Sequence, residues 1–268
     1  MSEAAIPGGN KPVLLESLDG GGVLRLVLNR PAARNALSVG LMTALAEALD
    51  RAAADKACRV VVIAGAGPAF CAGHDLRELR TDPGREAYQR VFAQCSALML
   101  RIVELPKPLI AEVHGIATAA GCQLVATCDL AVAAEDARFA TPGVNIGLFC
   151  STPMVALTRA VGRKAAMEML LTGDLVDAAT ARALGLVNRV VPRAELAAAT
   201  MGLARQIAAK SALTVAIGKA AFYHQAGLGL ADAYRYAAEV MTNNMLARDA
   251  AEGIDAFLAK RHPVWQDA

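Results

Sequence analysis

The stretch His114–Pro153, HGIATAAGCQLVATCDLAVAAEDARFATPGVNIGLFCSTP, decides how the rest of the chain is interpreted. The apolar segment before it, Leu109–Val113, has the composition of a buried strand. Small residues from Thr118 to Gly121 then lead into an apolar helix expected over 122–128. Free backbone N–H groups at a helix N-terminus can bind an anion, and small residues let a ligand approach. Taken alone, the stretch fits a tight packing turn at least as well as a binding site.

The composition limits the class of protein. The 268 residues are 55% hydrophobic but only 4% aromatic, which predicts a core of Ala, Val and Leu with one appendage. A net charge of +2 without basic runs argues against nucleic acid, and no apolar run is long enough for a membrane span. The six cysteines lack CxxC spacing, so we expect reduced thiols and no metal site. With no secretory signal pattern at the N-terminus, this favours a cytoplasmic protein.

Apolar periodicity divides the chain into alternating strands and helices. A glycine-rich turn at 19–22 predicts a hairpin, and Ser38 is the expected N-cap of the first long helix. The charged residues 77–87 are expected to form an exposed loop before a helix over 88–104. The remaining expected elements are strands over 60–64, 130–134, 138–140 and 187–191, and helices over 154–161, 164–171, 178–184 and from 194 onward.

This order of elements predicts an α/β fold with a C-terminal helical appendage. We divide the chain into a disordered lead-in over 1–12, a core over 13–198 and a C-terminal helical oligomerisation region over 199–268. The last region is rich in Ala and Met, as expected for a helical face that packs against another subunit.

Two small-residue turns have the same local design. One is Ala72–Leu76, and the other is Thr118–Gly121. Each offers a backbone N–H after small residues at the end of a strand. If both N–H groups pointed at one atom, they would form an oxyanion hole that polarises a thioester or ester carbonyl. Whether the turns meet depends on the tertiary structure.

An ordered series of short motifs resembles the enoyl-CoA hydratase/isomerase (crotonase) family, from about Val13 to Trp265. The motifs are Asn29-Arg30-Pro31, Asn35-Ala36-Leu37, Phe70–Leu76, His114-Gly115, Gly121–Leu124, Cys128-Asp129, Phe139–Pro142, Gly147, Leu171-Thr172-Gly173 and Ala183–Val187. The resemblance implies a crotonase-like spiral of ββα turns and a C-terminal helical region used in trimerisation. It also implies an acyl-CoA ligand of fatty-acyl-CoA metabolism, no further cofactor, and a homotrimer or dimer of trimers.

The resemblance also implies which residues form the site. It places the oxyanion donors at the backbone N–H groups of His74 and Ala120, where relatives usually have Gly at the second position. The imidazole of His74 is expected to point to a loop or to solvent, with an acid–base role as the alternative. Phe257 and Lys260 would approach the nucleotide end of a ligand, in the same or a neighbouring subunit. The full set of implied substrate-binding residues is Ala32, Arg34, Ala72, Gly73, Asp75, Leu76, Thr118, Gly121, Pro142, Phe257 and Lys260.

Two positions depart from the pattern of a hydratase. Hydration of a 2,3-double bond needs one group that activates water and one that delivers a proton to C2. The resemblance assigns these roles to two glutamates, but this chain has Gln123 and Gly143 there, and neither titrates. We therefore expect slow hydration by an enzyme of the lyase or isomerase type. The alternatives are a non-catalytic acyl-CoA binder and a thioester hydrolase or acyl transferase that uses water or Cys150. Cys150 could equally be a thiol that only packs in the core.

Overall fold

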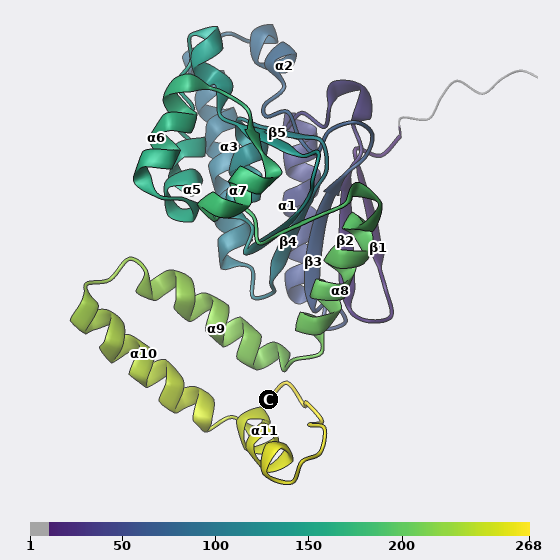
Figure 1. Ribbon diagram of the computed structural model, residues 1–268, viewed down its shortest axis with the longest axis vertical. Coiled ribbons are helices and arrows are strands. Elements are labelled where there is room, and N and C mark those ends of the chain that lie inside the picture. The colour runs from purple at the N-terminus through teal and green to yellow at the C-terminus, as the bar shows by residue number, and fades with distance from the viewer. Residues whose placement is uncertain (1–10) are drawn as a thin grey trace, which may run out of the picture.

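A six-stranded sheet forms the centre of the computed structural model, which describes residues 11–268. Figure 1 shows the sheet with helices packed around it and a separate group of helices below. Only the first two strands are antiparallel, and every other neighbouring pair is parallel. In sheet order the strands are β1 (Leu14–Leu18), β2 (Val23–Leu28), β3 (Val60–Gly65), β4 (Leu109–Val113), β6 (Leu130–Ala134) and β9 (Arg189–Val191).

The predicted hairpin is confirmed. Leu14 pairs with Leu28 and Leu18 pairs with Leu24 across β1 and β2. Gly22 closes the turn at a φ of +81°, a conformation that side chains other than glycine rarely adopt. The first five residues of β3 are buried, which agrees with its continuous apolar sequence and its place inside a parallel sheet.

A smaller sheet contains β5 (Ile116–Thr118), β7 (Arg138–Ala140) and β8 (Val176–Asp177). The chain passes from β4 to β5 and then into helix α4 (Ala120–Thr127), and it next passes from β6 to β7. Each passage adds one strand to the large sheet and one to the small sheet. The predicted spiral of ββα turns is therefore confirmed.

Helices cover both faces of the large sheet. On one face lie α1 (Val39–Ala54), which Ser38 caps as predicted by accepting the Leu41 N–H, and α3 (Arg85–Glu104). On the other face, α8 (Leu196–Ala208) buries Leu203 and Ala204 against the sheet. The remaining helices of the core are α5 (Pro153–Ala160), α6 (Arg163–Thr172) and α7 (Ala178–Leu184).

The predicted loop over 77–87 is wrong. Helix α2 (Leu76–Thr81) occupies most of it, and α3 begins at Arg85. Asp75 explains the difference, because its carboxylate accepts the N–H groups of Arg77 and Glu78 and so starts α2. Asp75 was expected to organise a loop as a hydrogen-bond acceptor, and it instead caps a helix.

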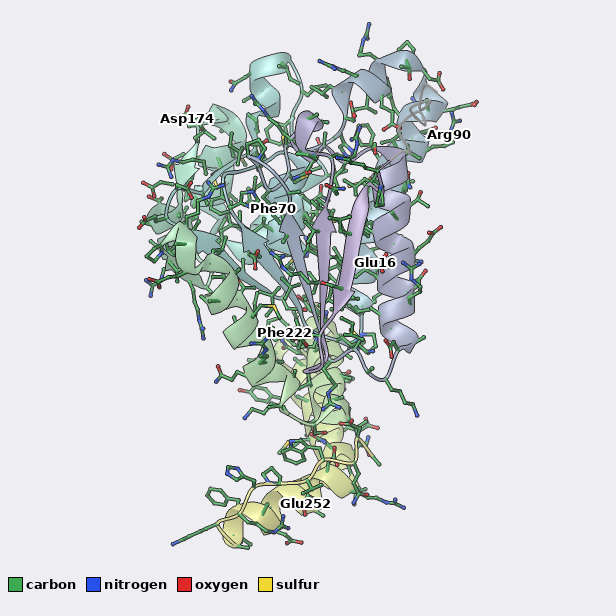
Figure 2. All side chains as sticks on the ribbon, turned by 90° about the vertical axis from the view of Figure 1, so that its right-hand side faces the viewer. Glu16, Phe70, Arg90, Asp174, Phe222 and Glu252 are labelled. Carbon is green, nitrogen blue, oxygen red and sulfur yellow. The ribbon has the colours of Figure 1, made fainter. Side chains whose placement is uncertain are left out.

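Three helices extend away from the core at the C-terminal end: α9 (Ala212–Gln225), α10 (Leu230–Met245) and α11 (Arg248–Leu258). In Figure 2, Phe70 lies within the core and Glu252 lies at the far end of this extension. The predicted boundary at 198–199 falls inside α8, whose buried face belongs to the core, so the break lies instead between α8 and α9. The predicted lead-in falls almost wholly on residues 1–10, outside the described residues.

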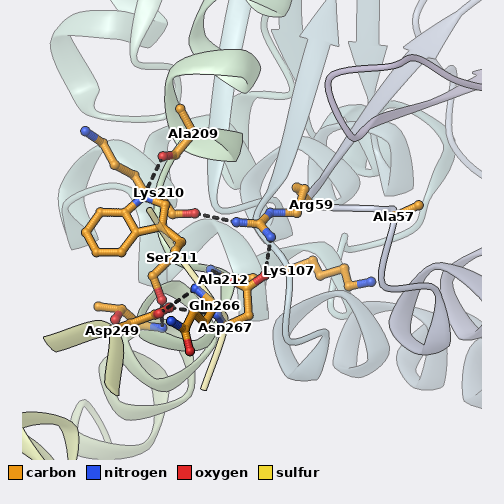
Figure 3. Close-up of polar contacts among 12 residues, drawn as sticks. Ala57, Arg59, Lys107, Ala209, Lys210, Ser211, Ala212, Asp249, Gln266 and Asp267 are labelled. Atoms are coloured by element: carbon orange, nitrogen blue, oxygen red, sulfur yellow. Dashed lines mark hydrogen bonds and ion pairs between the residues drawn. The ribbon is translucent and has the colours of Figure 1, made fainter. Parts of the chain in front are cut away.

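The chain end ties this extension to the core (Figure 3). Arg59 forms an ion pair with Asp267 at 2.5 Å and donates to the Lys210 carbonyl at 2.6 Å. The Trp265 indole N–H donates to the Ala209 carbonyl at 2.9 Å. Within residues 11–268, no helix is both long and apolar enough to cross a membrane.

Candidate functional site

The two small-residue turns meet in space. Cys71 donates its N–H to the Ile116 carbonyl at 3.1 Å, and Thr118 donates to the Cys71 carbonyl at 3.0 Å. These two hydrogen bonds hold Cys71, two residues before Gly73, alongside β5. Strand β5 in turn leads directly into α4. A Cβ added to Gly73 would lie 3.3 Å from the Ala120 nitrogen. The turns that the sequence could only pair as a hypothesis are therefore in contact.

Glycine is required at both turns for steric reasons. Gly73 has a φ of +94°, and an added Cβ would also lie 2.9 Å from Ala119 Cβ. At Gly121 an added Cβ would lie 2.1 Å from the Cys71 carbonyl oxygen, closer than any side chain can approach. The close approach of the two turns thus depends on the missing side chains.

The backbone N–H groups of His74 and Ala120 are free to bind a ligand. Among residues 11–268, neither N–H donates to a backbone or side-chain acceptor. Helix α4 begins at Ala120, two residues earlier than predicted, so the Ala120 N–H belongs to its open first turn. The unusual φ of +51° falls on Ala119 and not on Ala120. The methyl group of Ala120 therefore needs no strained backbone.

A polar framework holds the first turn. The Arg30 guanidinium forms an ion pair with Asp75 at 2.8 Å and donates to the Ala36 carbonyl at 2.5 Å. The Arg30 side chain holds the pKa of Asp75 below its ordinary value. Asn35 is fully buried, and its amide donates to the carbonyls of Ala66 and Ala69, both at 2.8 Å. Sequence reasoning gave no role to Arg30 or Asn35, although an Asn among buried apolar residues is a usable signal of a structural amide.

The two positions expected for glutamates differ in the space they offer. Gln123 is 4% exposed, and its side-chain oxygen has no hydrogen-bond partner among the described residues. At Gly143, an added Cβ would lie 2.6 Å from the Leu148 carbonyl oxygen and 3.0 Å from Cys150 Sγ. The Cys150 thiol thus borders the space where a side chain at residue 143 would begin. Burial raises the pKa of Cys150, which keeps it protonated at neutral pH.

The His74 imidazole lies neither in a polar loop nor free in solvent. The residue is half-buried, and both ring nitrogens are shielded from solvent without a hydrogen-bond partner in the described part of the chain. The ring packs edge-on against Phe92 of α3, with 5.4 Å between the ring centres. Within residues 11–268, no group of three or more His, Cys, Asp or Glu side chains is arranged to hold a metal ion.

Comparison with known proteins identifies the family to which this site belongs. Residues 19–268 match the pattern of the enoyl-CoA hydratase/isomerase family. The chain belongs to that family. It is 48% identical to human enoyl-CoA hydratase domain-containing protein 3, mitochondrial, over 95% of this chain and 84% of the human one. The mouse protein of the same name is 46% identical over 98% of this chain and 88% of its own length.

Solved structures of this family share the fold over nearly the whole chain. An enoyl-CoA hydratase from Mycobacterium smegmatis is 55% identical, with a TM-score of 0.93 over 95% of this chain and 99% of that one. Human enoyl-CoA hydratase domain-containing protein 3 is 47% identical, with a TM-score of 0.92 over 94% of this chain and 100% of the human chain. The predicted crotonase fold is therefore confirmed.

The expected cytoplasmic location is contradicted by the same comparisons. The human, mouse and Xenopus laevis relatives carry names that place them in mitochondria. The sequence argument rested on unpaired thiols and on the lack of a secretory pattern. Those features indicate a reducing compartment but do not separate one such compartment from another. The cytoplasmic assignment is therefore wrong.

The remaining residues implied by the family resemblance fall into two groups. Ala72, Gly73, Asp75, Thr118 and Gly121 lie in or beside the paired turns, with exposed Leu76 at the first position of α2. The other implied residues form the second group. Ala32 and Arg34 lie in and after the short helix η1 (Pro31–Ala33), and Pro142 starts the short helix η2 (Pro142–Ile146). Phe257 lies at the end of α11, and Lys260 follows that helix. Ala72 donates its N–H to the Arg34 carbonyl at 3.0 Å, so Arg34 lies beside the paired turns, whereas α11 lies in the extension, away from them (Figure 1).

Proposed function

We propose that this protein binds acyl-CoA thioesters and stabilises the enolate of the acyl group, as an enzyme of the lyase or isomerase type in fatty-acyl-CoA metabolism. The thioester oxygen would lie between the N–H groups of His74 and Ala120. The contact between the turns supports this most directly, because it brings a free N–H at Ala120 within 3.3 Å of the position of a Cβ on Gly73. Two fixed N–H donors stabilise the negative charge that develops on the oxygen.

Conventional hydration should be slow. General acid and base groups each contribute roughly a hundredfold to ten-thousandfold. The amide of Gln123 does not take up a proton in the physiological range, and Gly143 has no side chain. The site thus keeps the electrophilic half of hydratase chemistry and lacks the proton-transferring half.

A matched pair of glycine variants tests the binding site. Gly73→Ala should abolish binding of butyryl-CoA in isothermal titration, because the methyl group would fill the space beside the Ala120 N–H. Gly185→Ala is the control, since Gly185 has a nearly equal φ of +92° but caps α7. Equal loss of affinity in both variants would count against the oxyanion site.

A second experiment measures hydration of crotonyl-CoA by the loss of its enoyl absorbance. Fast turnover would refute our argument from Gln123 and Gly143.

A non-catalytic acyl-CoA binder is the second candidate. The absence of a titratable side chain at residues 123 and 143 favours it. Binding of several CoA thioesters with no product from any of them would support it.

Hydrolysis or acyl transfer through Cys150 is the third candidate, and the raised pKa of this thiol argues against it. Cys150→Ala that leaves every measured turnover intact would exclude the thiol as nucleophile.

We further propose a homotrimer or a dimer of trimers. Large apolar side chains on the C-terminal helices are exposed in the single chain, among them Leu230 (77%), Leu246 (81%) and Phe257 (82%). Such a surface is expected to be covered by another subunit. Assembly would also allow Phe257 and Lys260 of one subunit to approach the ligand of another. Sedimentation that shows a stable monomer at micromolar concentration would contradict this proposal.

A further inference from the structure

The proposed enolate site raises the question of which group removes the proton. Gln123 and Gly143 are excluded by their chemistry. Asp75 is committed to the Arg30 guanidinium and to the first N–H groups of α2. Cys150 is a protonated thiol in the apolar 143–150 segment. The His74 imidazole differs from these side chains, because it can titrate and has no hydrogen-bond partner among the described residues.

The His74 ring has the features of a group that awaits a polar partner. Both nitrogens are shielded from solvent and neither has a hydrogen-bond partner in residues 11–268. A buried polar group without a partner destabilises the fold, so such groups are rare away from functional sites. The ring belongs to the same residue whose N–H would hold the thioester oxygen. The ring and the proposed oxyanion donor are therefore joined through a single Cα.

The ring is neutral and so able to accept a proton. Burial lowers the pKa of His74 below its ordinary value of 6.5. The nearby Leu37 backbone opposes this with a smaller effect, although its distance and angle to the ring do not make a hydrogen bond. The nearest titratable groups along the chain and on the helix that carries Phe92 are Asp75, in its pair with Arg30, and Tyr88 and Cys95 of α3. None of them is among the causes of the shift. At neutral pH one nitrogen therefore carries a free lone pair.

The aromatic neighbour of the ring is partly open to solvent. Phe92, which packs edge-on against the imidazole, is 38% exposed. It also borders an open hollow of about 680 Å³ along α3, lined by Arg85, Tyr88, Gln89, Phe92, Ala93 and Ser96. An acyl chain that enters this hollow would displace the Phe92 ring and uncover the imidazole.

We propose that the His74 imidazole is the base that removes a proton from C2 of the bound acyl thioester, which rests on the function proposed above. The C2–H bond breaks and its proton moves to the unprotonated ring nitrogen. The electron pair forms a C1–C2 double bond, and the carbonyl π pair moves to the thioester oxygen. The N–H groups of His74 and Ala120 hold that oxygen. Return of a proton from the imidazolium to C2 restores the thioester.

The test is hydrogen exchange at C2 of butyryl-CoA in D₂O, followed by mass spectrometry, with binding measured separately by titration calorimetry. The wild-type protein should incorporate deuterium, and His74→Gln should slow this by about a hundredfold or more while butyryl-CoA still binds. The wild-type exchange rate should rise with pH and level off above a midpoint below 6.5. His74→Phe is the second variant, because it keeps an aromatic ring against Phe92 if the amide side chain disturbs folding.

Two further variants make the result specific. His224→Gln is the matched control, since His224 is an exposed histidine of α9, and it should exchange at the wild-type rate. Cys150→Ala tests the competing thiol, and loss of exchange in this variant with normal exchange in His74→Gln would overturn the proposal. The proposal is overturned if both His74 variants exchange like the wild type, or if the wild type binds butyryl-CoA without exchange. Failure of the wild type to bind butyryl-CoA at all would instead refute the proposed function.

Discussion

At the residue scale, the candidate site depends on the backbone more than on side chains. Its two proposed donors are backbone N–H groups. The side chains of His74 and Ala120 therefore do not affect whether a donor is present at these positions. The local cost is backbone strain at Ala119, which has φ +51° and ψ −119° directly before α4. Such conformations persist where the surrounding structure imposes them, often at functional sites.

Ala119→Gly should stabilise the protein. Relief of roughly 1–3 kcal/mol of strain outweighs the 0.4–1 kcal/mol that glycine adds to the unfolded chain entropy, giving a net gain of about 1 kcal/mol. Urea unfolding measures the difference. Ala126→Gly, inside α4, is the control and should lose about 1 kcal/mol. A loss of stability in Ala119→Gly would show that Ala119 carries no strain.

Gly143→Ala should destabilise the protein by about 1–3 kcal/mol, because overpacking forces neighbours to move. The added Cβ would lie 2.6 Å from the Leu148 carbonyl oxygen, which is backbone and yields poorly. Gly202→Ala on α8 is the control, since nothing lies within 4 Å of its added Cβ. It should be neutral or stabilising. Equal stability of the two variants in thermal unfolding would contradict the crowding at Gly143.

At the element scale, α2 and the Ala72–Leu76 turn form one unit. Asp75 caps the helix and also forms an ion pair with Arg30. The Asp75 carboxylate therefore fixes both the start of α2 and the position of the His74 N–H. The side chains of Arg30 and Asp75 are 23% and 15% exposed, which limits screening of the pair by water.

Asp75→Asn should cost about 1–2 kcal/mol of unfolding free energy, since it removes a charge-assisted hydrogen bond. The Arg30 side chain holds the folded pKa of Asp75 below its unfolded value near 3.9. The stabilisation is therefore complete above the unfolded value and is lost as the pH falls through the lower folded value. Urea unfolding from pH 7 to pH 3 should show the wild type converging on the variant only at the acidic end. In Asp82→Asn, the control, the exposed pair with Arg90 should contribute less than about 1 kcal/mol.

At the scale of the whole molecule, two sets of polar contacts hold the C-terminal extension to the core. In the first set, Lys219 of α9 forms an ion pair with Asp129 at 2.7 Å, and the Tyr223 hydroxyl donates to the same carboxylate at 2.8 Å.

The second set involves the end of the chain. Asp249 of α11 is buried and accepts the N–H groups of Gln266 and Asp267 at 2.7 and 3.0 Å. Asp267 in turn pairs with Arg59 of the core and accepts the Ala212 N–H at 2.7 Å. The last residues of the chain thus connect α9 and α11 to the sheet (Figure 3).

Arg59→Ala should loosen the extension while the core stays folded. The lost contacts with Asp267 and the Lys210 carbonyl should cost about 1–3 kcal/mol locally. Amide hydrogen exchange should therefore rise in α11, while Lys219 and Tyr223 keep α9 bound to Asp129 of the core. Arg235→Ala is the control, because its pair with Asp232 is exposed on α10 and worth less than about 1 kcal/mol. Unchanged protection of α11 in Arg59→Ala would contradict this prediction.

The sequence by itself determined the features that depend on neighbours a few residues apart. The hairpin of β1 and β2, the Ser38 cap and the buried strand β3 follow from local pattern and capping chemistry. The motif series indicated the family. The residue types of Gln123 and Gly143 alone show that both expected acid–base groups are missing. These are properties of residue type and short spacing, which a sequence displays directly.

Only the tertiary structure decided what depends on residues far apart in the chain. The contact of Gly73 with Ala120, the Cys150 thiol beside Gly143 and the unpartnered imidazole of His74 beneath Phe92 each join segments that packing brings together. Asp75 caps α2 through its own neighbours, but the ion pair that holds the same carboxylate comes from Arg30 in a distant turn. Packing between separate elements sets these positions, and no local pattern encodes it.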